Sequence, residues 1–83
     1  MVKTLTNWQI VPLSGGGVCA LGNFSGQPWK TTRITLARSG EIQTESGSIY
    51  RLRPEDQNVS LWGLALQMKR PKEYQTLVDN KVI

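Results

Sequence analysis

The sequence predicts an α+β fold that is mostly β: a five-stranded antiparallel meander or small open barrel of SH3-like size, with one or two short C-terminal helices. Two observations lead to this prediction. Clusters of Gly and Ser recur about every 7 to 14 residues between segments rich in Val, Ile, Thr, Trp and Tyr, which is typical of an antiparallel meander. After Arg53 the apolar residues change from alternate to helical spacing. The expected strands are residues 7–13, 18–23, 29–37, 41–45 and 49–52.

Pairing of the middle strands can be predicted from their apolar pattern. Three-residue loops at 38–40 and 46–48 place apolar residues opposite one another and set Arg33 opposite Glu45 and Arg53 opposite Glu41. Two-residue loops would set Leu36 beside Gln43 and Ile42 beside Arg51, so the three-residue loops are favoured. The expected buried face contains Ile34, Leu36, Ile42, Thr44, Tyr50 and Leu52, and the expected solvent face contains Arg33, Glu45 and Arg51.

The chain of 83 residues is expected to form one small domain, 1–83, with the sheet over about residues 5–53 and a helical segment over about residues 58–79. Ser60 is the expected cap of a first helix that ends at Arg70-Pro71, and a second helix is expected from Pro71 to near Asn80. A strand over residues 59–68 is the alternative, because Gly63 lowers helix propensity. The side chains expected against the sheet are Leu61, Leu64, Ala65 and Met68, with Trp62 at the rim.

The composition gives little reason to expect catalysis or metal binding. The chain has no His and one Cys, which removes the commonest general base and the commonest zinc ligands. The Gly15–Gly17 run lacks the Lys-Ser/Thr pair of a phosphate-binding loop and is expected to be a hairpin loop. Cys19 is expected to be a small core residue. We therefore expect no enzyme activity, no catalytic residue, no metal and no cofactor.

Localisation is predicted from what the segments lack. The first residues contain no apolar run typical of a signal peptide, and no segment approaches the roughly 20 apolar residues of a membrane span. A single Cys suits a reducing compartment. A cytoplasmic protein that does not bind membranes is expected.

Charge and aromatic residues define the candidate partner site. The net charge of +4 invites a nucleic-acid hypothesis, but acidic residues opposite the arginines would cancel part of the positive field. Trp29 is expected to share a face with Arg33, whereas Tyr50 lies on the apolar face. A protein partner is therefore preferred, nucleic acid is the alternative, and a homodimer fits either. The candidate partner-binding residues are Trp29, Lys30, Arg33, Arg51, Lys69, Arg70 and Lys72.

One segment resembles a known pattern. Residues 45–52, Glu-Ser-Gly-Ser-Ile-Tyr-Arg-Leu, preceded by the Trp-Lys-Thr-Thr-Arg-Ile segment 29–34, resemble the Thr-x-Ser-Gly-Ser-x-Tyr-x-Leu hairpin of short bacterial and phage proteins of unassigned activity. The resemblance covers about a third of the chain, and its residues have structural roles in a hairpin. It implies the same small β-domain and a phage or mobile-element origin, and it implies no activity.

Overall fold

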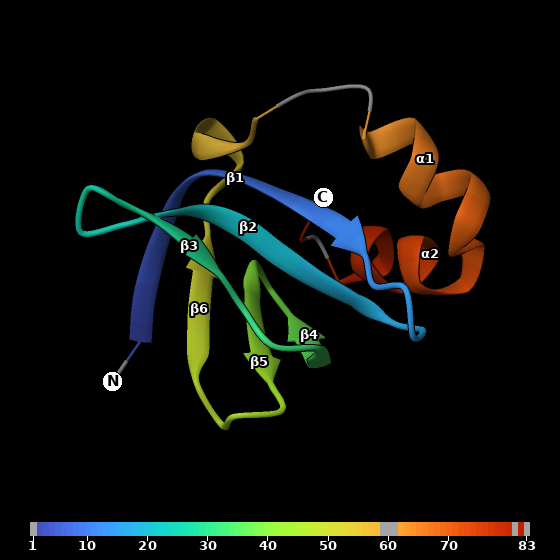
Figure 1. Ribbon diagram of the computed structural model, residues 1–83, viewed down its shortest axis with the longest axis horizontal. Coiled ribbons are helices and arrows are strands. Elements are labelled where there is room, and N and C mark those ends of the chain that lie inside the picture. Colours follow the sequence, from blue (N-terminus) through green and yellow to red (C-terminus); the bar gives the residue numbers. More distant parts are fainter. Residues whose placement is uncertain (1, 59–61, 81, 83) are drawn as a thin grey trace.

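The computed structural model describes residues 2–58, 62–80 and 82 and contains a curved sheet with two short helices at one end (Figure 1). Six strands form one mixed sheet in the order β3-β2-β1-β6-β5-β4. The α+β, mostly β class is confirmed, but the five-stranded antiparallel meander is wrong, because β1 and β6 pair in parallel. The elements are β1 (Val2–Pro12), β2 (Val18–Phe24), β3 (Gln27–Lys30), β4 (Ile34–Arg38), β5 (Glu41–Thr44), β6 (Ile49–Leu52), the 3-10 turn η1 (Pro54–Asp56), α1 (Trp62–Lys69) and α2 (Pro71–Asp79).

Strand β1 lies in the middle of the sheet, and a bulge divides it into two halves that pair with different strands. Its first half pairs in parallel with β6, and its second half pairs antiparallel with β2. The β1–β2 register shifts between Thr6 and Gln9, where Asn7 takes a φ of 49°. A bulge of this kind bends a strand and increases its twist. The bend brings β1 close to Gly22 of β2, where a Cβ would lie 2.8 Å from the Thr6 carbonyl oxygen.

The expected strand 29–37 is wrong, since it divides into β3 and β4 at opposite edges of the sheet. The link from Lys30 to Ile34 can span at most about 14 Å, so the sheet must curl until its two edges approach at one corner. No ladder joins β3 to β4 within the described residues, and the curled sheet stays open. Thr31 stabilises the break, because its hydroxyl accepts a hydrogen bond from the Ala20 N–H at 2.9 Å and donates one to the Thr32 carbonyl at 2.8 Å.

The β4–β5 hairpin has a two-residue turn where three residues were expected. Ser39 and Gly40 both have positive φ, 46° and 79°, which is the type I′ geometry that matches strand twist. Leu36 therefore lies opposite Gln43, and a register shift before it restores the expected Ile34–Thr44 pair. The predicted burial of Leu36 is wrong, because this side chain is 49% exposed.

The β5–β6 loop has the expected length but begins one residue earlier, between the paired residues Thr44 and Ser48. Ile42 consequently lies opposite Tyr50 rather than Leu52, and Glu41 lies opposite Arg51 rather than Arg53. A shift of this kind moves the pairing by two positions, which preserves the side of the sheet on which each side chain lies. The expected burial of Ile42, Thr44, Tyr50 and Leu52 and the expected exposure of Arg33, Glu45 and Arg51 are confirmed.

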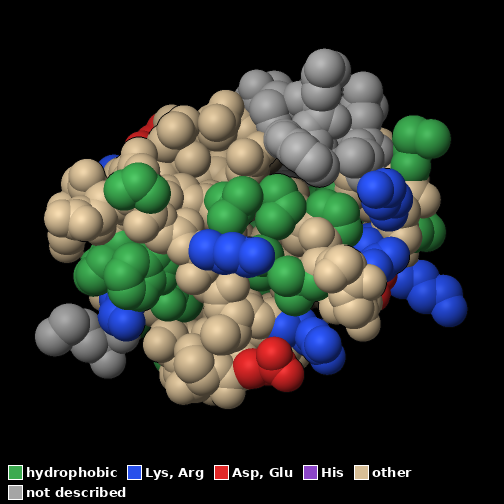
Figure 2. All heavy atoms as spheres, in the orientation of Figure 1, with side chains coloured by type: hydrophobic (Ala, Val, Ile, Leu, Met, Phe, Trp, Pro, Cys, Tyr) green, Lys and Arg blue, Asp and Glu red, His purple; other side chains and the backbone are tan. Residues whose placement is uncertain are grey.

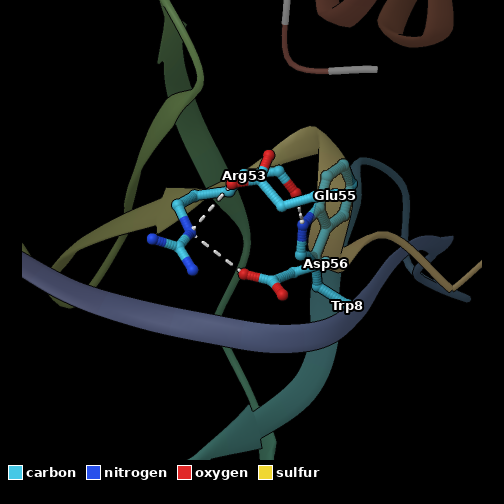
Figure 3. A network of polar contacts seen from close by, with 4 residues as sticks. All are labelled: Trp8, Arg53, Glu55 and Asp56. Carbon is cyan, nitrogen blue, oxygen red and sulfur yellow. Dashed lines mark hydrogen bonds and ion pairs between the residues drawn. The ribbon is translucent and has the colours of Figure 1, made fainter.

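The end of β6 is fixed by Trp8, which is fully buried. Its indole N–H donates to the carbonyl oxygen of Arg53 at 2.8 Å, and the Arg53 guanidinium pairs with Glu55 at 3.4 Å and Asp56 at 3.1 Å (Figure 3). Arg53 is thus held by the turn that follows it and is not the predicted partner of Glu41. These ion pairs are exposed and contribute little energy, so the buried Trp8 indole carries most of this contact.

Both C-terminal helices are confirmed, and the strand alternative for 59–68 is wrong for the described residues 62–68. The expected contact of Met68 with the sheet is also wrong: Met68 is 82% exposed, and Leu66 is buried in its place. Ser60, Leu61 and the side chains of Trp62, Leu64 and Ala65 lie outside the described part. The core cluster joins sheet and helices through Leu5, Trp8, Ile10, Val18, Ala20, Ile42, Tyr50, Leu52, Leu66, Leu77 and Val82.

Candidate functional site

A groove of about 480 Å³ lies between the edge strand β4 and helix α2. Four consecutive residues of β4, 34–37, line one side of it. Successive side chains on a strand point to opposite faces, so a groove lined by consecutive residues runs along the edge of the strand rather than over one face. The opposite wall is a single face of α2, formed by Lys72, Glu73, Thr76 and Leu77, together with Asn80 directly after the helix.

The free edge of β4 gives the groove its chemistry. Within the described residues β4 pairs only with β5, so its other side has no neighbouring strand. Alternate residues of an antiparallel strand direct their N–H and C=O groups away from the partner, and on an edge strand these groups can pair with another chain. Five residues of β4 offer an edge of about 17 Å in length.

The other edge of the sheet, β3, is protected against pairing. Pro28 lies within its four residues and lacks a backbone N–H, and Lys30 adds a charge at its end. Strand β4 contains no Pro, and its single charged residue, Arg38, stands at the turn. The two edges therefore differ, and β4 is the one open to an added strand.

Apolar and polar residues are separated in this groove. Val18 and Leu77 are buried core residues that also line it, and Leu36 is exposed beside it. Lys72, Glu73, Thr76 and Asn80 supply polar groups of both charges on the α2 wall. Pockets that bind ligands commonly combine an apolar lining with a few polar groups.

Only one of the predicted partner-binding residues, Lys72, lines this groove. Trp29 and Lys30 lie on β3 at the other edge of the sheet, and the Trp29 indole N–H donates to the Tyr50 hydroxyl at 3.0 Å. The Arg33 side chain lies over the Gly17 backbone. Arg51 is on β6 and pairs with Glu41 at 3.3 Å.

The remaining predicted residues lie at the junction of the two helices. Lys69 ends α1 and is exposed, whereas Arg70 is half-buried and donates from its guanidinium to the Leu13 carbonyl at 2.9 Å. Arg70 therefore ties the helices to the loop before β2 and has a structural role. Figure 2 shows several basic side chains close together at the end of the displayed face that carries the helices, others scattered over the rest of that face, and acidic side chains among them.

Sequence reasoning missed the β4 and α2 residues of the groove, although one signal was present. Lys72, Thr76 and Asn80 follow at intervals of four residues and therefore mark one face of the expected second helix. The strand side could not be found in the same way, because residues 29–37 were expected to form one paired strand, in which β4 would have had no free edge at this position.

Cys19 does not line the groove. Burial raises the pKa of the Cys19 thiol above its ordinary value of 9.0, and the nearby charge of Lys30 opposes that shift in part. Cys19 is buried, as expected. Among the described residues, no three His, Cys, Asp or Glu side chains gather in a group that could hold a metal ion.

Comparisons with protein-family models, with curated proteins and with solved structures found no match. In the part of the chain that the structure describes, no helix has the length and apolar character needed to cross a membrane.

Proposed function

We propose that this protein is a non-catalytic interaction module that binds an extended segment of a protein partner, which adds as a strand to the β4 edge beside α2. The observation that carries the proposal is the groove lined by four consecutive β4 residues and by one face of α2. Strand addition of this kind takes its affinity from main-chain hydrogen bonds and its specificity from pockets for alternate side chains.

The side chains around β4 fit such a segment. Leu36 borders the groove on one side and a smaller hollow with Ile42 and Ile49 on the other, so it offers an apolar contact to the partner. The polar residues of α2 face the opposite side of the segment. Because Lys72 and Glu73 carry opposite charges, we expect a partner segment without a strong net charge.

The proposal is tested by selecting peptides from a random library on the folded protein and mapping them by amide hydrogen exchange. Bound peptides should slow exchange in Ile34–Arg38, because the added strand pairs with free amides there. The variant Leu36→Lys should weaken binding by about tenfold or more, since a charge on an edge strand opposes pairing. Met68→Lys is the matched control, because Met68 is highly exposed and does not line the groove.

Two results would contradict the proposal. One is peptide binding that is unchanged in both the Leu36→Lys and the Met68→Lys variant. The other is slowed amide exchange in β3 rather than in β4. A homodimer that pairs β4 with β4 is a distinct outcome, and light scattering at rising protein concentration would reveal it as a mass twice that of the single chain.

Nucleic-acid binding is the alternative, and the residues assigned to it are Trp29, Lys30, Arg33, Arg51, Lys69, Arg70 and Lys72. Its support is weaker, because Arg51 pairs with Glu41 and Arg70 is bound to the Leu13 carbonyl. An anisotropy titration with single-stranded and duplex oligonucleotides decides between the two. Micromolar binding at physiological salt, lost in the Lys30→Ala/Arg51→Ala variant, would favour nucleic acid. A phage or mobile-element origin and a cytoplasmic location stay predictions from the sequence.

A further inference from the structure

An aromatic cage at the other end of the sheet holds the ammonium group of Lys3. The Lys3 Nζ lies 5.7 Å from the ring centroid of Phe24, 5.6 Å from that of Trp29 and 5.7 Å from that of Tyr50. Cations within about 6 Å of a ring centroid are attracted by the negative face of the ring. The first residues of β1 lie at the end of the sheet away from α1 and α2 (Figure 1), so the cage is separate from the β4 groove.

The cage is held in place by the sheet. Its rings come from β2, β3 and β6, and β1 runs between β2 and β6, with Lys3 directly opposite Tyr50. The Trp29 indole N–H donates to the Tyr50 hydroxyl at 3.0 Å, and Phe24 meets Trp29 edge to face at a centroid distance of 5.3 Å. The rings are therefore pre-organised around the cation, which lowers the ordering cost of binding.

The spacing of the rings fits a cation larger than that of Lys3. The three distances of 5.6–5.7 Å are nearly equal. A methyl carbon bonded to the nitrogen at about 1.5 Å and touching a ring carbon at about 3.5–4.0 Å would fill most of this gap. A primary ammonium has no such methyl groups, so Lys3 occupies the cage without filling it.

Access to the cage is available from solvent. Trp29 is 37% exposed, and both Phe24 and Lys3 are half-buried, whereas Tyr50 forms the buried base. Among the described residues Lys3 makes no ion pair with a carboxylate, so no anion holds it there. Its long flexible stem can leave the cage by side-chain rotation alone.

From these observations we infer that the Phe24–Trp29–Tyr50 cage is a binding site for a quaternary ammonium group, with Lys3 as a built-in competitor for it. Recognition of quaternary ammonium ligands is the recurrent functional use of aromatic cages. The ligand class is a trimethylated cation, carried either by a choline-type headgroup or by a trimethylated lysine side chain.

The test is an NMR titration of isotope-labelled protein, followed at the Trp29 indole N–H. Choline and acetyl-trimethyl-lysine amide are the two probes, and the tighter one identifies the source of the ammonium group. Dimethylbutanol, the neutral isostere of choline, is the ligand control. In Lys3→Ala both cations should bind at least about tenfold more tightly than in the wild type, because the competing charge is gone. Lys3→Met is the matched variant: it is uncharged but keeps the cage filled, so it should not show this gain.

A measurement on the wild-type chain makes the inference independent of how Lys3→Ala folds. Ring currents should move the Lys3 ε-methylene resonance upfield, and added choline should return it toward the position of a free lysine. Trp29→Leu should abolish both effects. Equal binding of choline and dimethylbutanol, no response of the Trp29 indole, or an unshifted Lys3 resonance would each overturn the inference.

Discussion

At the scale of single residues, Gly22 shows how a close backbone approach determines the residue type. The bulge in β1 brings the Thr6 carbonyl within 2.8 Å and the Trp8 Cα within 3.1 Å of the place where a Cβ would stand. The φ of Gly22 is not positive, so the constraint is one of space rather than of backbone conformation. Because both neighbours are backbone atoms of the central strand, the clash cannot be relieved by rotating a side chain.

We therefore predict that Gly22→Ala lowers the free energy of unfolding by about 1–3 kcal/mol, the usual cost of overpacking. Gly15→Ala is the matched control, because a Cβ there would meet no atom within 4 Å and the φ is not positive. Urea unfolding followed by tryptophan fluorescence measures both variants. An equal effect of the two changes would show that the close approach of β1 and β2 has no energetic consequence.

Cys19 gives a prediction on pH, because burial raises the pKa of its thiol above 9.0 in the folded protein. The unfolded chain then loses this proton at lower pH than the folded chain. The contribution is fully present below the unfolded pKa and decreases as pH rises toward the folded pKa. We expect the free energy of unfolding to fall more steeply above pH 9 in the wild type than in Cys19→Ala. Parallel curves for the two proteins in urea melts at neutral and alkaline pH would contradict this expectation.

At the scale of elements, the hairpin turns depend on residues in the left-handed region. Ser25-Gly26 and Ser39-Gly40 both join strands by two residues with positive φ. Asn accepts this conformation at the first position better than Ser, which is why Asn-Gly is preferred in such turns. The sequence alone did not reveal the turn length at Ser39, because a three-residue loop separated apolar from polar side chains better than the two-residue turn that the structure has.

We predict that Ser39→Asn raises the free energy of unfolding by about 0.5 kcal/mol, a typical gain from a better-suited surface residue. Ser14→Asn serves as control, since Ser14 is also exposed but its φ is not positive. Thermal melts of the two variants and the wild type give the comparison. A decrease at Ser39, or the same gain at both positions, would rule out the turn conformation as the cause.

Much of the strand structure was predictable from the alternation of apolar and polar residues. This alternation shows on which face of the sheet a side chain lies more reliably than it shows which residue of the next strand is opposite. The β5–β6 pairing was displaced by two positions, yet Ile42, Tyr50 and Leu52 kept their face. The β4–β5 turn was one residue shorter than expected, and a one-residue change reverses faces, so Leu36 became exposed. The break of the expected strand 29–37 at Thr31 could not be predicted, because β-branched residues such as Thr favour a continued strand. The break depends on the contact of the Thr31 side chain with Ala20, which is distant in the sequence.

The candidate sites were less predictable than the elements, since each depends on pairing between distant segments. The β4 groove exists because β4 is an edge strand, which follows from the parallel β1–β6 pair and not from any local pattern. The same parallel pair sets Lys3 opposite Tyr50 in the aromatic cage. Lys72 was identified from charge alone, and charge gave no reason to associate it with Leu36.

At the scale of the whole molecule, the helices complete a core that the sheet does not close. Leu66, Leu77 and Val82 are buried in the same cluster as Leu5, Trp8 and other sheet residues. Fully burying one such side chain contributes about 1.5–3 kcal/mol. A chain of this size has a total stability of about 4–12 kcal/mol, from about 0.05–0.15 kcal/mol per residue. The contribution of the three side chains is therefore comparable to the stability of the whole fold.

We accordingly predict that a chain shortened to residues 1–58 does not unfold cooperatively, although it keeps every strand and the Trp8 contacts with Arg53 and Asn58. Circular dichroism during heating should show no sharp transition, because the apolar face of the sheet has lost its cover.

In the full chain, Leu66→Ala should lower the free energy of unfolding by about 2–5 kcal/mol. Met68→Ala on the same helix should change it by less than about 0.5 kcal/mol, as is usual for exposed positions. A soluble 1–58 fragment with a cooperative melt would show that the helices are an appendage, and equal effects at Leu66 and Met68 would place α1 outside the core.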